Sequence, residues 1–256
     1  MGNLSQAVWI ELLKARRTKM LLFTTLGFSL IPLVGGLFMI ILKDPQLARR
    51  IGLISVKAEI TMGSADWPSY LGFLSLAIAA SGIILFGFIV SYVFGREYSD
   101  RTVKDLLALP TSRSTIVLAK FVIVGSWSLV LTLLVLLLGF VVGILVGLPP
   151  VSSQMLWQGS INVSITAVLT ILLVTPIAFF ASAGRGYIPP MVAAFLAMAI
   201  AQVVAVLGWG EFFPWAIPGL YSQGEELGIL SYVILMLTSL AGFAGTFLWW
   251  ELADQT

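Results

Sequence analysis

The sequence predicts an all-α integral membrane protein with six transmembrane helices, an amphipathic helix at the N-terminus and a short helix between the second and third spans. Two observations predict this fold class. Hydrophobic residues make up 59% of the 256 residues and charged residues only 10%, whereas soluble domains carry about 25% charged residues. The apolar residues also form six long segments, each of roughly the 20 residues that a helix needs to cross a bilayer. We expect residues 1–256 to form a single transmembrane domain.

The first element is an amphipathic helix over about residues 3–17. One face of this helix is apolar and contains Leu4, Val8, Trp9, Leu12 and Leu13. Basic residues such as Lys14 and Arg17 lie elsewhere on the helix. A basic amphipathic helix with a Trp directly before a span is typical of a helix that lies in the plane of the cytoplasmic interface. The alternative is a positively charged flank that only sets the topology.

The six apolar segments are the expected spans. The third is longer than a crossing requires, so we expect Lys120 to lie at its wet end and the crossing to begin near Phe121. Pro32 and Pro176 fall within spans and predict kinks. The spans are about 20–42, 70–95, 114–148, 161–183, 187–207 and 229–250.

The basic residues predict the orientation of the chain in the cell membrane. If the N-terminus is cytoplasmic, ten of the 14 Lys and Arg residues lie inside and four lie outside. Because basic residues concentrate in cytoplasmic loops, we expect a multi-pass protein with both termini in the cytoplasm.

Two other features concern packing. The outer segment 208–228 is aromatic and contains Pro214 and Pro218, which interrupt a continuous helix. It is either a short helix that dips back into the outer leaflet or an interfacial loop. In the third span, Gly139, Gly143 and Gly147 lie on one helical face, where small residues let helices approach closely. These glycines serve packing within the subunit or contact with a second subunit.

Several classes of function are excluded by what the sequence lacks. There is no His and no Cys, and the net charge is only +2, so zinc sites, thiol chemistry and nucleic-acid binding have no support. There is no P-loop motif for ATP, and we expect no cofactor in the chain itself. With Lys120 at the edge, the spans contain no Asp, Glu, Lys or Arg, which argues against a proton-coupled carrier.

The loop between spans two and three carries the most information. Ser99 or Asp100 can cap a short helix, whose apolar face would include Val103, and Pro110 would end it. Thr111 or Ser112 can then cap the long third helix. A charged loop that only sets topology does not explain the apolar run Leu-Leu-Ala-Leu at 106–109.

This loop resembles the "E…GT…LL…P-x-S-R…K" stretch of ABC-2-type permeases, the membrane subunits of type-2 ABC exporters. Arg101 departs from the pattern, because the family often has Gly before the Thr. Segments 184–190 and 213–218 resemble the permeases that export bacitracin and lantibiotics. The residues that carry the loop resemblance are Glu97, Thr102, Leu106, Leu107, Pro110, Ser112, Arg113 and Lys120.

The resemblance implies a permease that is not itself an enzyme. A second copy or a related permease chain would pair with it, and separate ATP-binding cassette subunits would bind ATP and Mg²⁺. The helix at about 102–109 would be a coupling helix that sits in a cleft of the ATPase. The cargo would be an amphipathic peptide, an antibiotic or a lipid-like molecule, and lipids would surround the chain. The implied coupling residues are Glu97, Arg101, Thr102, Leu106, Leu107, Pro110, Arg113 and Lys120.

Two other functions stay open on the sequence. The first is a membrane-embedded enzyme that modifies a lipid or peptide, with Glu97 and Asp100 as its carboxylates. The second is an anchor or sensor that binds an ATPase but transports nothing, because a docking element does not by itself show a pathway.

Overall fold

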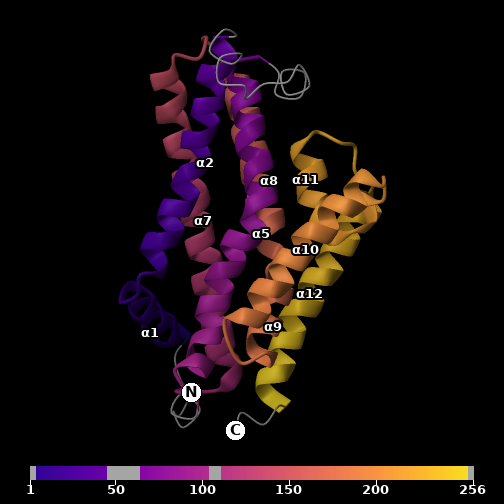
Figure 1. The fold of residues 1–256 in the computed structure, drawn as a ribbon. Coiled ribbons are helices and arrows are strands. Elements are labelled where there is room, and N and C mark those ends of the chain that lie inside the picture. Colours follow the sequence, from indigo (N-terminus) through magenta and orange to yellow (C-terminus); the bar gives the residue numbers. More distant parts are fainter. Residues whose placement is uncertain (1–3, 45–63, 104–110, 253–256) are drawn as a thin grey trace.

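The computed structural model describes residues 4–44, 64–103 and 111–252, and within them all regular elements are helical (Figure 1). Six helical segments are long and apolar enough to cross a membrane, which confirms the predicted fold class. These are α2 (Met20–Lys43), α5 (Trp67–Ser99), α7 (Arg113–Val146), α8 with α9 (Ser153–Leu172 and Thr175–Ala183), α10 (Ile188–Val206) and α12 (Ile229–Leu252).

The second span, α5, is longer at both ends than the sequence predicted. It begins after Asp66, whose carboxylate accepts a hydrogen bond from the Ser69 amide at 2.9 Å and so caps the helix. At its other end the helix continues through Ser99, and Asp100 occupies the C-cap. The prediction that Ser99 or Asp100 caps a following helix is therefore wrong, because both belong to the end of α5.

The third span, α7, begins as predicted. Ser112 is its N-cap, and the Ser112 hydroxyl accepts a hydrogen bond from the Thr115 amide at 3.3 Å. The helix ends at Gly147, which has a left-handed backbone with φ +71°. Gly139 and Gly143 pack within the same chain, against Leu74 and Trp67 of α5 respectively. A role of these glycines in contact with a second subunit stays a prediction.

The fourth span is broken into α8 and α9 directly before Pro176, as the proline predicted. Proline removes a helical hydrogen bond and obstructs a carbonyl. The Ser239 hydroxyl of α12 donates to the Leu172 carbonyl at 2.9 Å, and the Thr175 hydroxyl donates to the Ser239 carbonyl at 2.7 Å. A neighbouring helix thus provides partners for the polar groups at the break. Pro32, in contrast, lies inside an uninterrupted α2.

Close packing of α9 on α12 gives a first stability prediction. A Cβ atom at Gly242 would collide with the backbone of Pro176, whereas a Cβ at Gly245 would meet the Phe179 ring at an ordinary 3.5 Å. Overpacking costs about 1–3 kcal/mol, so we expect Gly242→Ala to lower the melting temperature of the purified protein. Gly245→Ala is the matched control and should not lower it, since Ala favours a helix over Gly. Equal melting temperatures for the two variants would contradict this packing.

Both described ends of the chain lie at one end of the bundle, which we name the loop end (Figure 1). It contains α1 (Leu4–Arg16), the last turn of α5, the first turn of α7, the turn between α9 and α10, and the end of α12. The predicted N-terminal helix is confirmed as α1, which packs mainly against α7. The opposite end is named the far end.

At the far end, the aromatic segment after α10 forms three short elements. They are the 3₁₀ helices η1 (Gly210–Phe212) and η2 (Pro214–Ala216), followed by α11 (Ile217–Ser222). Ile217, Pro218 and Ser222 are buried, and α11 packs against α8 and α5. The segment therefore contains a short helix, and whether this helix dips back into the outer leaflet stays a prediction.

Candidate functional site

Four charged side chains meet inside the loop end, and we name Glu11, Lys14, Glu97 and Lys120 the buried ion cluster. They come from three helices, because Glu11 and Lys14 lie on α1, Glu97 lies on the last turn of α5, and Lys120 lies on the third turn of α7. The cluster therefore connects the N-terminal helix to the two helices that flank the loop at 100–112.

Lys120 is the centre of the cluster. Its side chain is completely buried, and its ammonium donates to Glu97 Oε1 at 2.7 Å, to Glu11 Oε2 at 3.3 Å and to the Val93 carbonyl at 2.7 Å. An ammonium has three donors, so each of them has an acceptor. This arrangement satisfies the condition under which a buried charge is tolerated, namely a paired and fully hydrogen-bonded group.

Lys14 closes the cluster on its more exposed side. Its ammonium donates to Glu11 Oε1 at 2.7 Å and to Glu97 Oε1 at 3.1 Å. One oxygen of Glu97 thus accepts from both lysines, while its Oε2 is buried without a hydrogen-bond partner among the described residues. Two cations and two anions balance, so removing any one member leaves a buried charge uncompensated.

The structure corrects the sequence interpretation of two residues. Lys120 was predicted at the wet end of its span, but it is 0% exposed because Glu11 and Glu97 neutralise it. Glu11 was not recognised as a site residue. The available signal was that it is the one acidic residue in positions 1–43. On the side of α1 that faces the protein, Glu11 and Ala15 are buried and Val8 and Leu12 pack against the core. The other large residues of the predicted apolar face, such as Trp9, are exposed.

The backbone directly after α5 has a defined turn. The Thr102 amide donates to the Glu97 carbonyl at 2.9 Å, and Arg101 between them has a left-handed conformation with φ +58°. This is the Schellman arrangement, in which the left-handed residue is usually Gly. It gives a physical reason for the Gly that the resembling permeases often have here. The described part ends at Val103, which is buried.

The turn gives a second stability prediction. A residue with a Cβ is disfavoured in the left-handed region by about 1 kcal/mol, so Arg101→Gly should raise the melting temperature. Arg101→Ala is the control, because it also removes the charge but keeps the Cβ. We expect the Gly variant to melt above the Ala variant in differential scanning fluorimetry. The reverse order would show that the turn is not strained.

Most of the predicted coupling helix lies outside the described residues. This applies to Leu106, Leu107 and Pro110, so their predicted role stays untested. Arg113, another predicted coupling residue, lies at the start of α7, and its guanidinium donates to the Trp250 carbonyl at 3.0 Å. The start of α7 is therefore attached to the end of α12.

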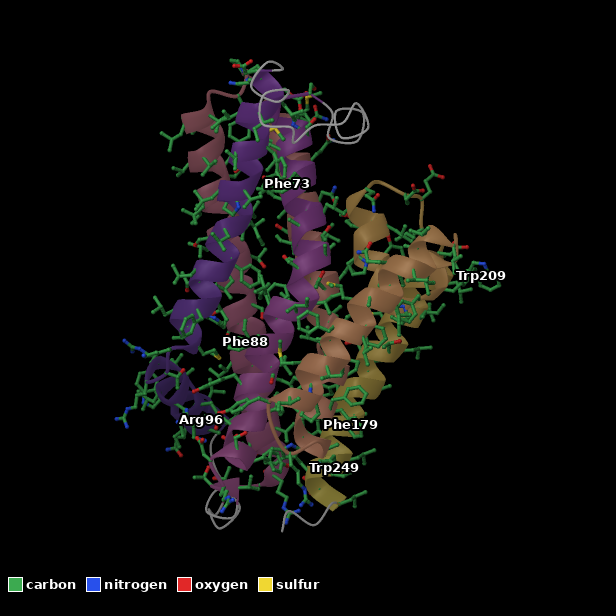
Figure 2. All side chains as sticks on the ribbon, viewed as in Figure 1. Phe73, Phe88, Arg96, Phe179, Trp209 and Trp249 are labelled. Carbon is green, nitrogen blue, oxygen red and sulfur yellow. The ribbon has the colours of Figure 1, made fainter. Side chains whose placement is uncertain are left out.

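The turn between α9 and α10 also contacts α5 at the loop end. The Ser91 hydroxyl donates to the Tyr187 carbonyl at 2.9 Å, and the rings of Tyr92 and Tyr187 stack with centroids 5.7 Å apart. Burial, with Asp100 nearby, raises the pKa of the Tyr187 phenol. Gly95 lies against the backbone of Gly186. Figure 2 shows this end with Arg96, whose guanidinium donates to the Lys14 carbonyl at 3.3 Å.

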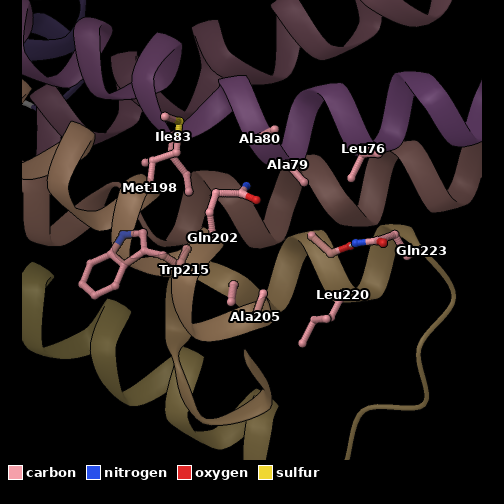
Figure 3. A pocket seen from close by; sticks show the side chains of 13 residues that line it. Leu76, Ala79, Ala80, Ile83, Met198, Gln202, Ala205, Trp215, Leu220 and Gln223 are labelled. Atoms are coloured by element: carbon pink, nitrogen blue, oxygen red, sulfur yellow. The ribbon is translucent and has the colours of Figure 1, made fainter. Parts of the chain in front are cut away.

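A small cavity lies nearer the far end, between α5, α10 and α11. Its volume is about 80 Å³, and Figure 3 shows Gln202, Trp215 and Gln223 among the side chains that line it. The other lining residues are apolar or small, such as Ala79 and Ile83, and none of the described residues that line it is charged. The cavity can therefore accept an apolar group and offer carboxamide hydrogen bonds.

The sequence of the chain is similar to those of known transport proteins. Residues 7–201 match the model of a family described as ABC-2 family transporter protein. The chain is also similar to the bacitracin transport permease protein BCRB of Bacillus licheniformis, with 28% identity over 177 residues that cover 68% of this chain and 85% of that protein. No solved structure matches the chain.

Proposed function

Since this chain belongs to the ABC-2 family of transporter proteins, we propose that it is the permease of an ATP-driven exporter whose loop between α5 and α7 receives movement from a separate ATPase. The family match, the similar permease and the six apolar helices support the general part of this function, namely that the chain is the permease subunit of an ABC transporter and a multi-pass membrane protein. The direction of transport, the coupling residues and the cargo belong to the proposal.

The proposed assembly contains two permeases and two ATP-binding cassette subunits that hold ATP and Mg²⁺. The loop end faces the cytoplasm of the cell, where the ATPases are. The excess of basic residues at that end supports this orientation. The chain provides the membrane helices, and ATP hydrolysis takes place in its partners.

The buried ion cluster is the observation that supports coupling. Lys120 on α7 and Glu97 on α5 flank the loop, and their 2.7 Å ion pair keeps the two helix ends at a fixed separation. Glu11 adds α1 to the same unit. A force applied to the loop would therefore move three helices together. Nucleotide can bias such a movement only through different affinities for the two states of the assembly.

The proposed cargo is an amphipathic molecule without a strong charge on its buried part. The cavity in Figure 3 supports this, because apolar side chains surround Gln202 and Gln223. The similar permease from Bacillus licheniformis is described as a bacitracin transport protein. Bacitracin is therefore the first probe for transport.

The proposal is tested by expressing the chain together with its ATP-binding subunit, which we expect to be encoded by a neighbouring gene. We expect the two to copurify, and we expect ATP hydrolysis only in the complex. Movement of labelled bacitracin across proteoliposomes separates an exporter from an anchor that binds an ATPase and transports nothing. Failure to bind the ATPase with or without nucleotide would contradict the proposal.

A further inference from the structure

The side of α1 that faces away from the bundle is apolar and uncovered by any described part of the chain. Trp9, Ile10 and Leu13 are 56%, 47% and 36% exposed. They lie opposite Glu11 and Ala15, which face α7 and are buried. Exposed large apolar side chains in a row on one helix face indicate contact with another molecule or with lipid.

Three exposed basic residues follow at the end of α1 and in the turn before α2. They are Arg16, Arg17 and Lys19, which we name the α1 basic edge. None of the three forms a salt bridge with a described residue. Glu11 is the one acidic residue near them in the sequence, and it is used in the buried ion cluster. The macrodipole of α1 favours a basic residue at Arg16, but it does not explain Lys19, which precedes the next helix.

We propose that this side of α1 binds the headgroups of anionic phospholipids. The apolar side chains would enter the boundary between headgroups and acyl chains, and the α1 basic edge would contact the phosphates. A zwitterionic bilayer can bury the apolar side chains, but it carries no net charge that would complement the basic residues. The three uncompensated cations, however, complement a surface that is negative overall. A basic residue close to an anionic leaflet contributes about fivefold to binding.

This lipid contact would also influence the loop, and that consequence rests on the proposed function. Trp9 and Leu13 occupy one side of α1 while Glu11 occupies the other, so lipid that holds the outer side in place also holds Glu11 against Lys120. We therefore expect ATP hydrolysis in the complex to be higher in anionic than in zwitterionic bilayers. The headgroup contact itself requires no ATPase.

The test uses the full chain, which contains no cysteine. A single Leu13→Cys substitution, labelled with a bimane fluorophore, places a reporter on the exposed side of α1. The protein is reconstituted alone into nanodiscs of phosphatidylcholine and phosphatidylglycerol at a 7:3 ratio. Two samples are compared. A doxyl label close to the headgroup is attached to phosphatidylcholine in one sample and to phosphatidylglycerol in the other, at the same mole fraction. We expect phosphatidylglycerol to quench about two- to fivefold more strongly, and 0.5 M NaCl to remove most of the difference.

Two variants identify the source of any preference. The triple variant Arg16→Gln, Arg17→Gln and Lys19→Gln should make the two lipids quench equally. The double variant Arg16→Lys and Arg17→Lys keeps all three charges and should keep the stronger quenching by phosphatidylglycerol. Equal quenching by the two lipids when the α1 basic edge is unchanged would overturn the proposal. Stronger quenching by phosphatidylglycerol in the Gln variant would overturn it as well. So would the absence of quenching by either lipid, which would indicate that a second copy covers α1. Failure of the ATPase effect alone would instead contradict the proposed coupling.

Discussion

Replacing Leu106 and Leu107 together by Asp is expected to separate the permease from its ATPase. These residues form the apolar part of the predicted coupling helix, and two carboxylates cannot occupy an apolar cleft without loss of most of the binding energy. We expect at least a hundredfold weaker binding of the ATPase, about 3 kcal/mol, and no transport. The measurement is copurification with the ATPase, followed by transport in proteoliposomes.

The matched control is the pair Leu106→Met and Leu107→Met, which keeps an apolar surface of similar volume. It should bind the ATPase and transport at close to the original rate. The melting temperature of the isolated chain should be similar in both double variants, because the changes lie in the loop. ATPase binding and transport by the Asp variant at the original level would refute the coupling helix.

The second large effect is expected in the buried ion cluster. Glu97→Gln leaves the fully buried Lys120 with a weaker partner, and breaking a buried ion pair costs about 3–5 kcal/mol. Lys120→Met should be destabilising as well, because Glu97 then keeps only Lys14. The double variant should be less destabilised than the sum of the single variants, since the pair is removed as a unit. The double-mutant cycle is measured by thermal unfolding of the purified single and double variants.

Asp100→Asn is the control for this cycle. It removes an exposed ion pair, in which Arg96 Nε lies 3.2 Å from Asp100 Oδ2, and such pairs contribute at most about 1 kcal/mol. At temperatures where all variants are folded, we expect the Glu97 and Lys120 variants to transport less cargo per ATP hydrolysed. Additive single effects would show that Glu97 and Lys120 are not coupled. A loss of transport in Asp100→Asn as large as in the Glu97 and Lys120 variants would show that the effect does not come from the buried ion cluster.

The general architecture could be predicted because it follows from local properties of the chain. Long apolar segments predict the spans, Pro176 predicts the break between α8 and α9, and Ser112 predicts the start of α7. Each of these depends on residues within a few positions of one another. The periodicity of α1 predicted a helix for the same reason, and the structure confirms it.

The candidate site depends on contacts between distant residues, which one sequence does not reveal. Glu11 and Lys120 are 109 positions apart, and neither position alone indicates that the other neutralises it. The general expectation that a lysine near a helix end reaches water therefore gave the wrong environment for Lys120. The left-handed turn at Arg101 was also hidden, although the Gly of the resembling permeases at this position was a usable signal.

Crosslinking from the loop tests the central claim most directly. Because the chain has no cysteine, Leu106→Cys or Leu107→Cys provides a single labelling site for a maleimide benzophenone in the loop. In a separate variant, Trp209→Cys places the same label at the far end. On illumination of the complex, we predict that a loop probe forms a covalent adduct with the ATPase and that the far-end probe forms none. Adducts from the far end only, or from no position while the ATPase is bound, would contradict coupling through this loop.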